Sequence, residues 1–267
     1  MKRTEITLFG YETYVSDLRA RYGGFGGMYP AGRYPAGTDS ADSPPVIGIK
    51  DDTPWKRGLN AIVPVSFAVT GGVLFAAAYP AFSAVLAEFL RGYGAEPFSA
   101  RALHALDDAM REPLAASGYR QDRFPERYAF SCLLRSADSP PDLSVPGLRL
   151  LAPEDAELEN RTSMKLSDCI ARTAAAVIRD GAVLCVASIN SANGAGACRE
   201  IGVECTPAFR GKGFGSACVS LLARTLAARG EIPLYQHYCV NQASAHTAAR
   251  AGFAEAGRFY AYTAFHR

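Results

Sequence analysis

The residues best suited to chemistry form a glycine-rich segment near the C-terminus, Arg210-Gly-Lys-Gly-Phe-Gly215. We predict a strand over residues 198–206 before this segment and a helix over residues 215–229 after it. Glycines let such a loop turn tightly and approach a ligand closely. The helix presents unpaired N–H groups and the positive end of its dipole, so the loop can hold phosphate oxygens. The spacing fits neither the P-loop nor the dinucleotide-binding fingerprint.

Two ordered motifs in this region resemble the GNAT superfamily of N-acyltransferases. In the first motif, IGVECTPAFRGKGFG over residues 201–215, Arg210, Gly213 and Gly215 match the family pattern [R/Q]-x-x-G-x-[G/A] between a strand and a helix. The second motif, NQASAHTAARAGF over residues 241–253, is similar to the family's helix pattern N-x-x-[A/S] followed by G-F. The resemblance covers residues 148–267 and leaves the N-terminal half unassigned.

The resemblance implies an α/β (α+β) fold in which a mixed sheet is flanked by helices. It also implies that an acyl group, with acetyl as the expected case, passes from acyl-CoA to an amine of an acceptor in a ternary complex. The motifs do not identify this acceptor, and the near-neutral charge favours a small molecule over a polyanion. The main chain of residues 203–205 would pair with the pantetheine arm, and the loop amides would hold the CoA diphosphate. The cofactor-binding residues that it implies are Val203, Cys205, Arg210, Gly211, Lys212, Gly213, Phe214, Gly215, Asn241 and Ser244.

Acyl transfer needs a group that removes the proton of the amine and a means of stabilising the departing thiolate. Glu204, on the CoA-facing strand, is the predicted catalytic base, directly or through water; the alternative is a solvent-facing strand residue. Many family members carry a tyrosine general acid seven residues after the motif asparagine, where this chain has Ala248. Either another group protonates the thiolate, or it leaves unprotonated. Five side chains remain open as acids or bases and can equally be structural: Tyr235, Tyr238, Tyr260, His237 and His246.

The absent tyrosine keeps a second class of function open, a non-catalytic acyl-CoA binding or sensing module with a degenerate site. Cys205 and Cys239 could be taken for nucleophiles. Without a histidine at a known spacing, we predict that both are buried hydrophobes.

A segment rich in proline, residues 136–147, predicts a linker. It would divide the chain into an N-terminal α/β domain, residues 1–135, and the acyltransferase-like domain, residues 148–267. The N-terminal domain would shape the acceptor site or mediate association. A stretch rich in Gly, Pro and Ser, residues 22–45, predicts a surface loop or, alternatively, a lid.

Two helices are predicted from apolar periodicity and capping signals. One spans residues 100–112, with Ser99 as its N-cap and Pro113 as its end. The other spans residues 154–171. Between the strands 174–179 and 182–189, Asp180-Gly181 predicts a tight hairpin turn.

The uncharged run of residues 61–87 is long enough to cross a bilayer. However, Val63, Val65, Phe67 and Val69 alternate at period two, a Gly-Gly pair follows, and Pro80 suits the first turn of an amphipathic helix. We therefore predict two strands and a helix in place of a membrane span.

The composition of the chain bears on its partners, on metal binding and on its cellular location. The 267 residues carry a net charge of +2, which gives no reason to expect a nucleic-acid partner. The seven cysteines form no C-x-x-C pair, so neither a disulfide framework nor a metal site is expected. The N-terminus lacks the apolar core of a secretory signal. We expect a cytoplasmic protein without metal, acting as a monomer or a homodimer.

Overall fold

The computed structural model describes residues 8–21, 29–30, 47–50, 52, 60–121, 128–136, 140–190 and 198–266. Most of the predicted loop at 22–45 and part of the predicted linker therefore lie outside the described residues. The fold is mixed α/β, as predicted. Contacts divide the chain into unit 1 (residues 1–14, 131–237 and 241–256) and unit 2 (residues 15–130, 238–240 and 257–267). Helix α1 (Tyr11–Arg21) contributes residues to both.

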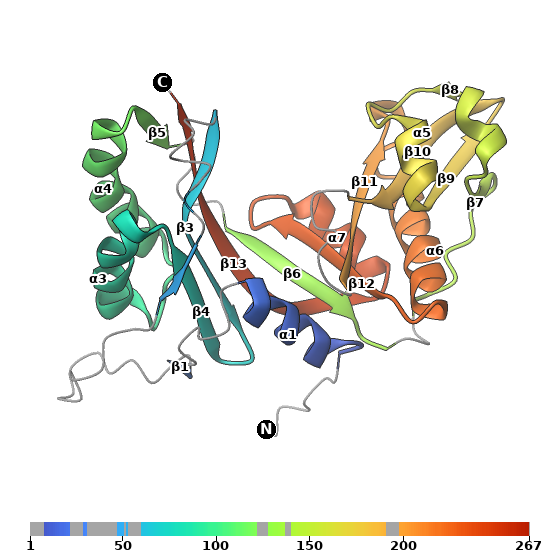
Figure 1. Ribbon diagram of the computed structural model, residues 1–267. Helices are drawn as coiled ribbons and strands as arrows, with labels where there is room; N and C mark the ends of the chain where they lie inside the picture. Colours follow the sequence, from blue (N-terminus) through green and yellow to red (C-terminus); the bar gives the residue numbers. More distant parts are fainter. Residues whose placement is uncertain are drawn as a thin grey trace. The chain divides into compact units, whose positions relative to one another are not determined.

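Unit 1 is built on a mixed sheet (Figure 1). Its neighbouring strands, in spatial order, are β6 (Ala129–Leu134), β12 (Ile232–Tyr238), β11 (Cys198–Cys205), β10 (Ala182–Ile189), β9 (Ala174–Arg179) and β7 (Leu148–Leu150). Strands β11 and β12 are parallel, whereas β11, β10, β9 and β7 pair antiparallel. The sheet is thus mixed, as the resemblance implied.

Helices cover both faces of the β9–β10 hairpin. Ala174 and Ala176 pack with Leu166 and Cys169 of α5 (Leu166–Arg172) in one buried cluster. Because side chains alternate along a strand, Arg179 points to the opposite face, where its guanidinium lies 4.8 Å from the ring centre of Phe214, the first residue of α6 (Phe214–Ala228). The hairpin turn itself has positive φ at Asp180 (49°) and Gly181 (75°), as predicted for this dipeptide.

The predicted helix over residues 154–171 is wrong. The chain forms the 3₁₀ turn η2 (Pro153–Glu157), the short strand β8 (Glu159–Asn160) and only then α5. The Asn160 side chain explains the interruption. Its Nδ2 donates to the Met164 carbonyl oxygen at 2.6 Å and its Oδ1 accepts from the Thr162 N–H at 3.0 Å. A side chain that binds nearby backbone groups in this way competes with the helix.

Unit 2 contains the antiparallel hairpin β3 (Ala61–Thr70) and β4 (Val73–Ala78), with β3 paired to β13 (Phe253–His266) from Gly257 onward. After the hairpin come the 3₁₀ turn η1 (Pro80–Phe82) and α3 (Ser83–Tyr93). The uncharged run is therefore two strands and the start of a helix, as predicted. The edge strands are β1 (Tyr29–Pro30), β2 (Gly48–Ile49) and β5 (Tyr119–Gln121). No helix in the described part of the chain could span a membrane.

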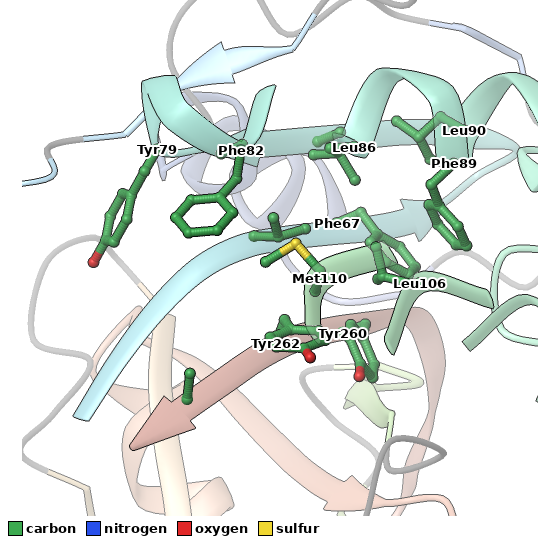
Figure 2. Packing of buried hydrophobic residues seen from close by; sticks show 14 of the residues in the cluster. Phe67, Tyr79, Phe82, Leu86, Phe89, Leu90, Leu106, Met110, Tyr260 and Tyr262 are labelled. Atoms are coloured by element: carbon green, nitrogen blue, oxygen red, sulfur yellow. The ribbon is translucent and has the colours of Figure 1, made fainter. Parts of the chain in front are cut away.

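The core of unit 2 lies between its sheet and the helices α3 and α4 (Ala100–Ala116) (Figure 2). Phe67 stacks on Tyr260 of β13, with ring centres 5.3 Å apart. Ser99 caps α4 as predicted, since its Oγ accepts the Ala102 N–H at 3.3 Å. The predicted end at Pro113 is wrong, because α4 continues through it and buries Leu114 in the core.

Lys50 carries a largely buried ammonium group in unit 2, and its titration gives a test of this packing. Its Nζ donates to the Val63 carbonyl oxygen at 2.6 Å, and burial lowers its pKa to about 8. Between pH 8 and about 10.4, Lys50 therefore binds fewer protons in the folded chain than in the unfolded chain. Its contribution to the free energy of unfolding rises with pH in that range.

We expect the free energy of unfolding of the wild type, relative to Lys50→Met, to rise by about 1–2 kcal/mol between pH 7.5 and 9.5. Urea denaturation of both proteins at each pH measures this difference, and taking the difference cancels the other titrating groups. A difference that stays flat or falls with pH would show that the ammonium is solvated.

Candidate functional site

The parallel strands β11 and β12 separate partway along their length. They pair from Cys198 with Ile232 to Ile201 with Tyr235, where the described pairing ends. On the other side, β11 stays paired with β10 as far as Cys205. The Thr206 N–H donates to the Leu184 carbonyl oxygen of β10, and the Glu200 carbonyl oxygen accepts the N–H of Asn190, the residue after β10. Because backbone direction alternates, Val203 and Cys205 turn their N–H and C=O groups away from β10, toward the side that β12 leaves open.

A groove of about 690 Å³ occupies this opening. All of its lining residues belong to unit 1. One wall is β11, with Val203, Glu204 and Cys205, and the other is formed by Tyr235 of β12 and the first turns of α7 (Gln242–Arg250). The predicted cofactor-binding residues all line this groove except Lys212, whose Nζ lies 4.7 Å from the ring centre of Phe209.

Most residues of the predicted phosphate loop line the groove. The loop follows the 3₁₀ turn η4 (Pro207–Phe209) and leads into α6. Gly213 is the N-cap residue of this helix, with a φ of 83°. The first intrahelical bond runs from the Ala217 N–H to the Gly213 carbonyl oxygen at 3.0 Å. The N–H groups of the preceding residues 214–216 have no acceptor within the helix, and they lie at the positive end of its dipole. This end of the groove is suited to an anion.

Two arginines flank the loop. The Arg210 Nε donates to the Cys205 carbonyl oxygen at 3.2 Å, which ties the loop to the end of β11. Arg250, in the last turn of α7, lines the groove, and a Cβ on Gly213 would lie 3.5 Å from its Nη2. Arg250 was not among the predicted site residues. Helical spacing from the motif asparagine could have found it, because residues 243, 246, 247 and 250 share one face of a helix.

If the groove binds CoA, as the resemblance implies, Arg250→Ala is expected to weaken that binding about tenfold, because it removes one charged donor beside the predicted phosphate loop. Isothermal titration calorimetry at two salt concentrations measures the affinity and its salt dependence. Arg224→Ala provides the control, since Arg224 pairs with Asp142 and does not line the groove. Equal affinities for the two variants would remove Arg250 from the anion site.

The Glu204 carboxylate is held in place by Ser163. One of its oxygens accepts the Ser163 N–H at 3.1 Å and the other accepts the Ser163 hydroxyl at 2.7 Å. Ser163 lies in the segment between β8 and α5, whose backbone bonds to the Asn160 side chain. The break in the predicted helix of residues 154–171 therefore places Ser163 against Glu204. Each carboxylate oxygen retains a second lone pair for a proton or a water molecule.

Of the five candidate acid–base residues, two line the groove. Tyr235 lines the groove, and its Oη lies 2.8 Å from Ser244 Oγ. His246 also lines the groove, whereas His237 is not among the lining residues. Tyr238 and Tyr260 belong to unit 2, where the Tyr260 hydroxyl accepts a bond from Gln121 Nε2 at 3.2 Å. Ala248 is buried, with 3% of its surface exposed.

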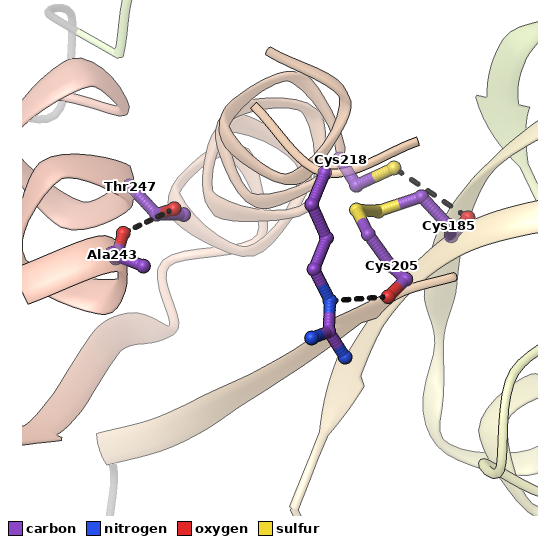
Figure 3. Close-up of a disulfide and its surroundings, with 6 residues drawn as sticks. Cys185, Cys205, Cys218, Ala243 and Thr247 are labelled. Atoms are coloured by element: carbon purple, nitrogen blue, oxygen red, sulfur yellow. Dashed lines mark hydrogen bonds between the residues drawn. A yellow bond between two sulfur atoms is a disulfide. The ribbon is translucent and has the colours of Figure 1, made fainter. Parts of the chain in front are cut away.

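The prediction that the cysteines are unpaired is wrong for two of them. Cys185 and Cys205 form a disulfide across β10 and β11 (Figure 3). They face each other in the antiparallel register with a Cα–Cα distance of 4.1 Å, and close approach is typical of a pair that does not exchange backbone bonds. Cys239 is half-buried rather than buried, and it is not part of a disulfide. The cytoplasmic location stays a prediction. Among the described residues no metal-binding cluster occurs.

The fold and the groove define an α/β domain in which two parallel strands, β11 and β12, separate beside the N-terminus of α6. Residues 145–253 match the family model described as Acetyltransferase (GNAT) family. The chain therefore contains a GNAT acetyltransferase domain, as the two sequence motifs indicated.

Several solved structures are similar to the chain. A protein assigned to the GNAT acetyltransferases from Novosphingobium aromaticivorans is 21% identical, with a TM-score of 0.44 over 56% of this chain and 68% of its own. A GCN5-related N-acetyltransferase from Sphaerobacter thermophilus is 13% identical, with a TM-score of 0.41 over 74% of this chain and 75% of its own. One from Kribbella flavida is 13% identical, with a TM-score of 0.39 over 80% and 91%. No curated protein matches the sequence.

Proposed function

We propose that this protein is an acyl-CoA-dependent N-acyltransferase that transfers an acyl group, most simply acetyl, to an amine of a small-molecule acceptor. The observation that carries the proposal is the groove between β11 and β12, which ends at the first turn of α6. An extended ligand with a phosphate group at one end fits this shape and charge. Acyl-CoA supplies a thioester whose carbonyl carbon accepts the amine.

The residues present fit such a ligand from end to end. The open edge of Val203 offers a backbone N–H and C=O to an extended arm, in the manner of an added strand. The Cys205 carbonyl oxygen is already engaged by Arg210. At the other end, Gly211, Gly213 and Gly215 let the diphosphate approach the amides of the loop. Asn241 caps α7 and thereby positions the groove-lining face of that helix.

Glu204 takes the role of base in this proposal. A protonated amine must lose a proton before or during its attack on the thioester. Ser163 fixes the orientation of the carboxylate through two hydrogen bonds, so that the remaining lone pairs can accept this proton directly or through one water molecule.

The proposal is tested by CoA release from acetyl-CoA with a panel of amines that includes an aminoglycoside, a polyamine, an amino acid and a peptide. Amine-dependent release supports the proposal, and the panel ranks the acceptor classes. Tight binding of CoA without release for any amine would favour the alternative, a non-catalytic acyl-CoA binding module. Absence of CoA binding would exclude both functions.

Glu204→Gln is expected to lower kcat/KM about 100-fold or more near neutral pH, because a positioned base contributes about 10²–10⁴ to such a reaction. Ser163→Ala is the comparison, since it keeps the carboxylate and removes one of its hydrogen bonds, and a smaller loss is expected. If Glu204→Gln leaves the rate and the pH profile unchanged, the base lies elsewhere.

A further inference from the structure

Two hydroxyl groups meet inside the groove, near the point where β11 and β12 separate. Tyr235 Oη lies 2.8 Å from Ser244 Oγ. The Tyr235 side chain is buried, and its ring packs against Phe253 with ring centres 5.8 Å apart. Ser244 lies in the first turn of α7, where its N–H donates to Asn241 Oδ1 at 3.0 Å. A strand and a capped helix terminus therefore hold both hydroxyls in place.

The direction of this hydrogen bond follows from the chemistry of the two groups. A phenol is more acidic than an aliphatic alcohol, so Tyr235 is the better donor and Ser244 Oγ the acceptor. Burial raises the pKa of Tyr235, which keeps its proton in place. The Ser244 hydroxyl then has its own hydrogen available for another acceptor. Accepting a bond at Oγ also polarises that O–H group and strengthens it as a donor.

The side chain of Ser244 is half-buried and lines the groove together with Val203 and Cys205. A ligand arm that pairs with the open edge of β11 therefore passes close to this hydroxyl. One turn further along α7, Ala248 offers no polar group. Residue 248 therefore cannot stabilise a leaving group, and Ser244 is the hydroxyl of α7 that faces Tyr235 in the groove.

We propose that the Ser244 hydroxyl donates a hydrogen bond to the sulfur of CoA as the thioester breaks, and that Tyr235 is the positioning residue that orients and polarises Ser244. The inference rests on the acyltransferase function proposed above. When the tetrahedral intermediate collapses, the carbon–sulfur bond breaks, its electron pair goes to sulfur and the carbonyl double bond re-forms. The thiolate takes its proton from water. The proton of the amine passes to Glu204 and then to water, so Tyr235 and Ser244 lose none.

The test compares Ser244→Ala, Ser244→Thr, Tyr235→Phe and the double variant Ser244→Ala/Tyr235→Phe in the full-length chain, by CoA release from acetyl-CoA with the most reactive amine of the panel. We expect Ser244→Ala to lower kcat about 30-fold, somewhat below the effect of removing an oxyanion donor. The KM for acetyl-CoA should change less than about threefold, because the bond forms mainly in the transition state. Ser244→Thr should retain most of the wild-type kcat, because threonine keeps the hydroxyl group.

Tyr235→Phe is expected to lower kcat about fivefold, and the double variant should be no slower than Ser244→Ala, because Tyr235 acts only through Ser244. Tyr262→Phe is the matched control: it removes a buried tyrosine hydroxyl bond to Asp107 in the core of unit 2 and should keep the wild-type kcat. CoA affinity, measured by calorimetry, reports whether each variant retains its groove.

Three results would overturn the inference while leaving the proposed function intact: an unchanged kcat in Ser244→Ala, a loss confined to KM, or additive effects in the double variant. A wild-type chain that binds acetyl-CoA and releases no CoA with any amine would instead overturn the proposed function, and this inference with it.

Discussion

Gly147→Ala is expected to lower the free energy of unfolding by about 3 kcal/mol or more, the larger part of it from a steric clash. Gly147 has a φ of 83°, and a Cβ at this position would lie 2.0 Å from the carbonyl oxygen of Ile178. The neighbour is backbone in β9, and the Ile178 N–H also donates to the Gly147 carbonyl oxygen at 2.9 Å. Moving the two backbones apart to relieve the overlap would break the hydrogen bond between Ile178 and Gly147, just before β7 begins.

Gly181→Ala is the matched control for the strain of positive φ. Gly181 has a φ of 75°, and a Cβ there would meet no atom within 4 Å. We expect a loss of about 1 kcal/mol in this variant, from backbone strain alone. Thermal unfolding followed by circular dichroism measures both, and Gly147→Ala should reduce the Tm by about 10 °C. Equal losses in the two variants would mean that the segment before β7 moves freely.

Gly213→Val is expected to reduce CoA affinity at least about 100-fold. Backbone strain and steric crowding act on the loop together, so the loss should exceed that from removing any single side-chain contact. Gly213 has a φ of 83°, a conformation that a β-branched residue resists strongly. Its side chain would also enter the space beside Arg250, where the Cβ alone lies 3.5 Å from Nη2. Both effects displace the amides that precede the first bond of α6.

Gly230→Val separates loss of the site from loss of the fold. Gly230 follows the other end of α6 with a φ of 74°, and nothing lies within 4 Å of its Cβ position. It should therefore carry a similar strain while CoA affinity, measured by calorimetry, stays at the wild-type value. Wild-type affinity in Gly213→Val would show that CoA does not use this loop.

Local chemistry accounts for the parts of the fold that could be predicted from the sequence. Asp180-Gly181 sets a turn with two positive φ values, Ser99 caps α4, and alternation followed by Pro80 identifies β3, β4 and α3. Each signal acts within a few residues, so no knowledge of distant contacts is needed. Pro113 shows the limit of such signals, because burial of Leu114 carries α4 past it.

The position of the glycine-rich loop was predictable for a related reason. Its glycines and the helix after it follow one another along the chain, so the sequence by itself determined that this loop precedes α6. The rest of the site depends on residues far apart in sequence. Ser163 meets Glu204, Arg250 approaches Gly213, and Tyr235 meets Ser244 only after the strands and helices have packed.

Register explains why these partners could not be foreseen. The disulfide between Cys185 and Cys205 exists because the pairing of β10 and β11 sets those two residues opposite each other, and a shift of one residue would turn their side chains to opposite faces. The sequence determined the turns, the caps, the glycine-rich loop and the family motifs, all of which act locally. The tertiary structure alone decided which side chains face one another across the groove, because strand register and helix packing are properties of the whole folded chain.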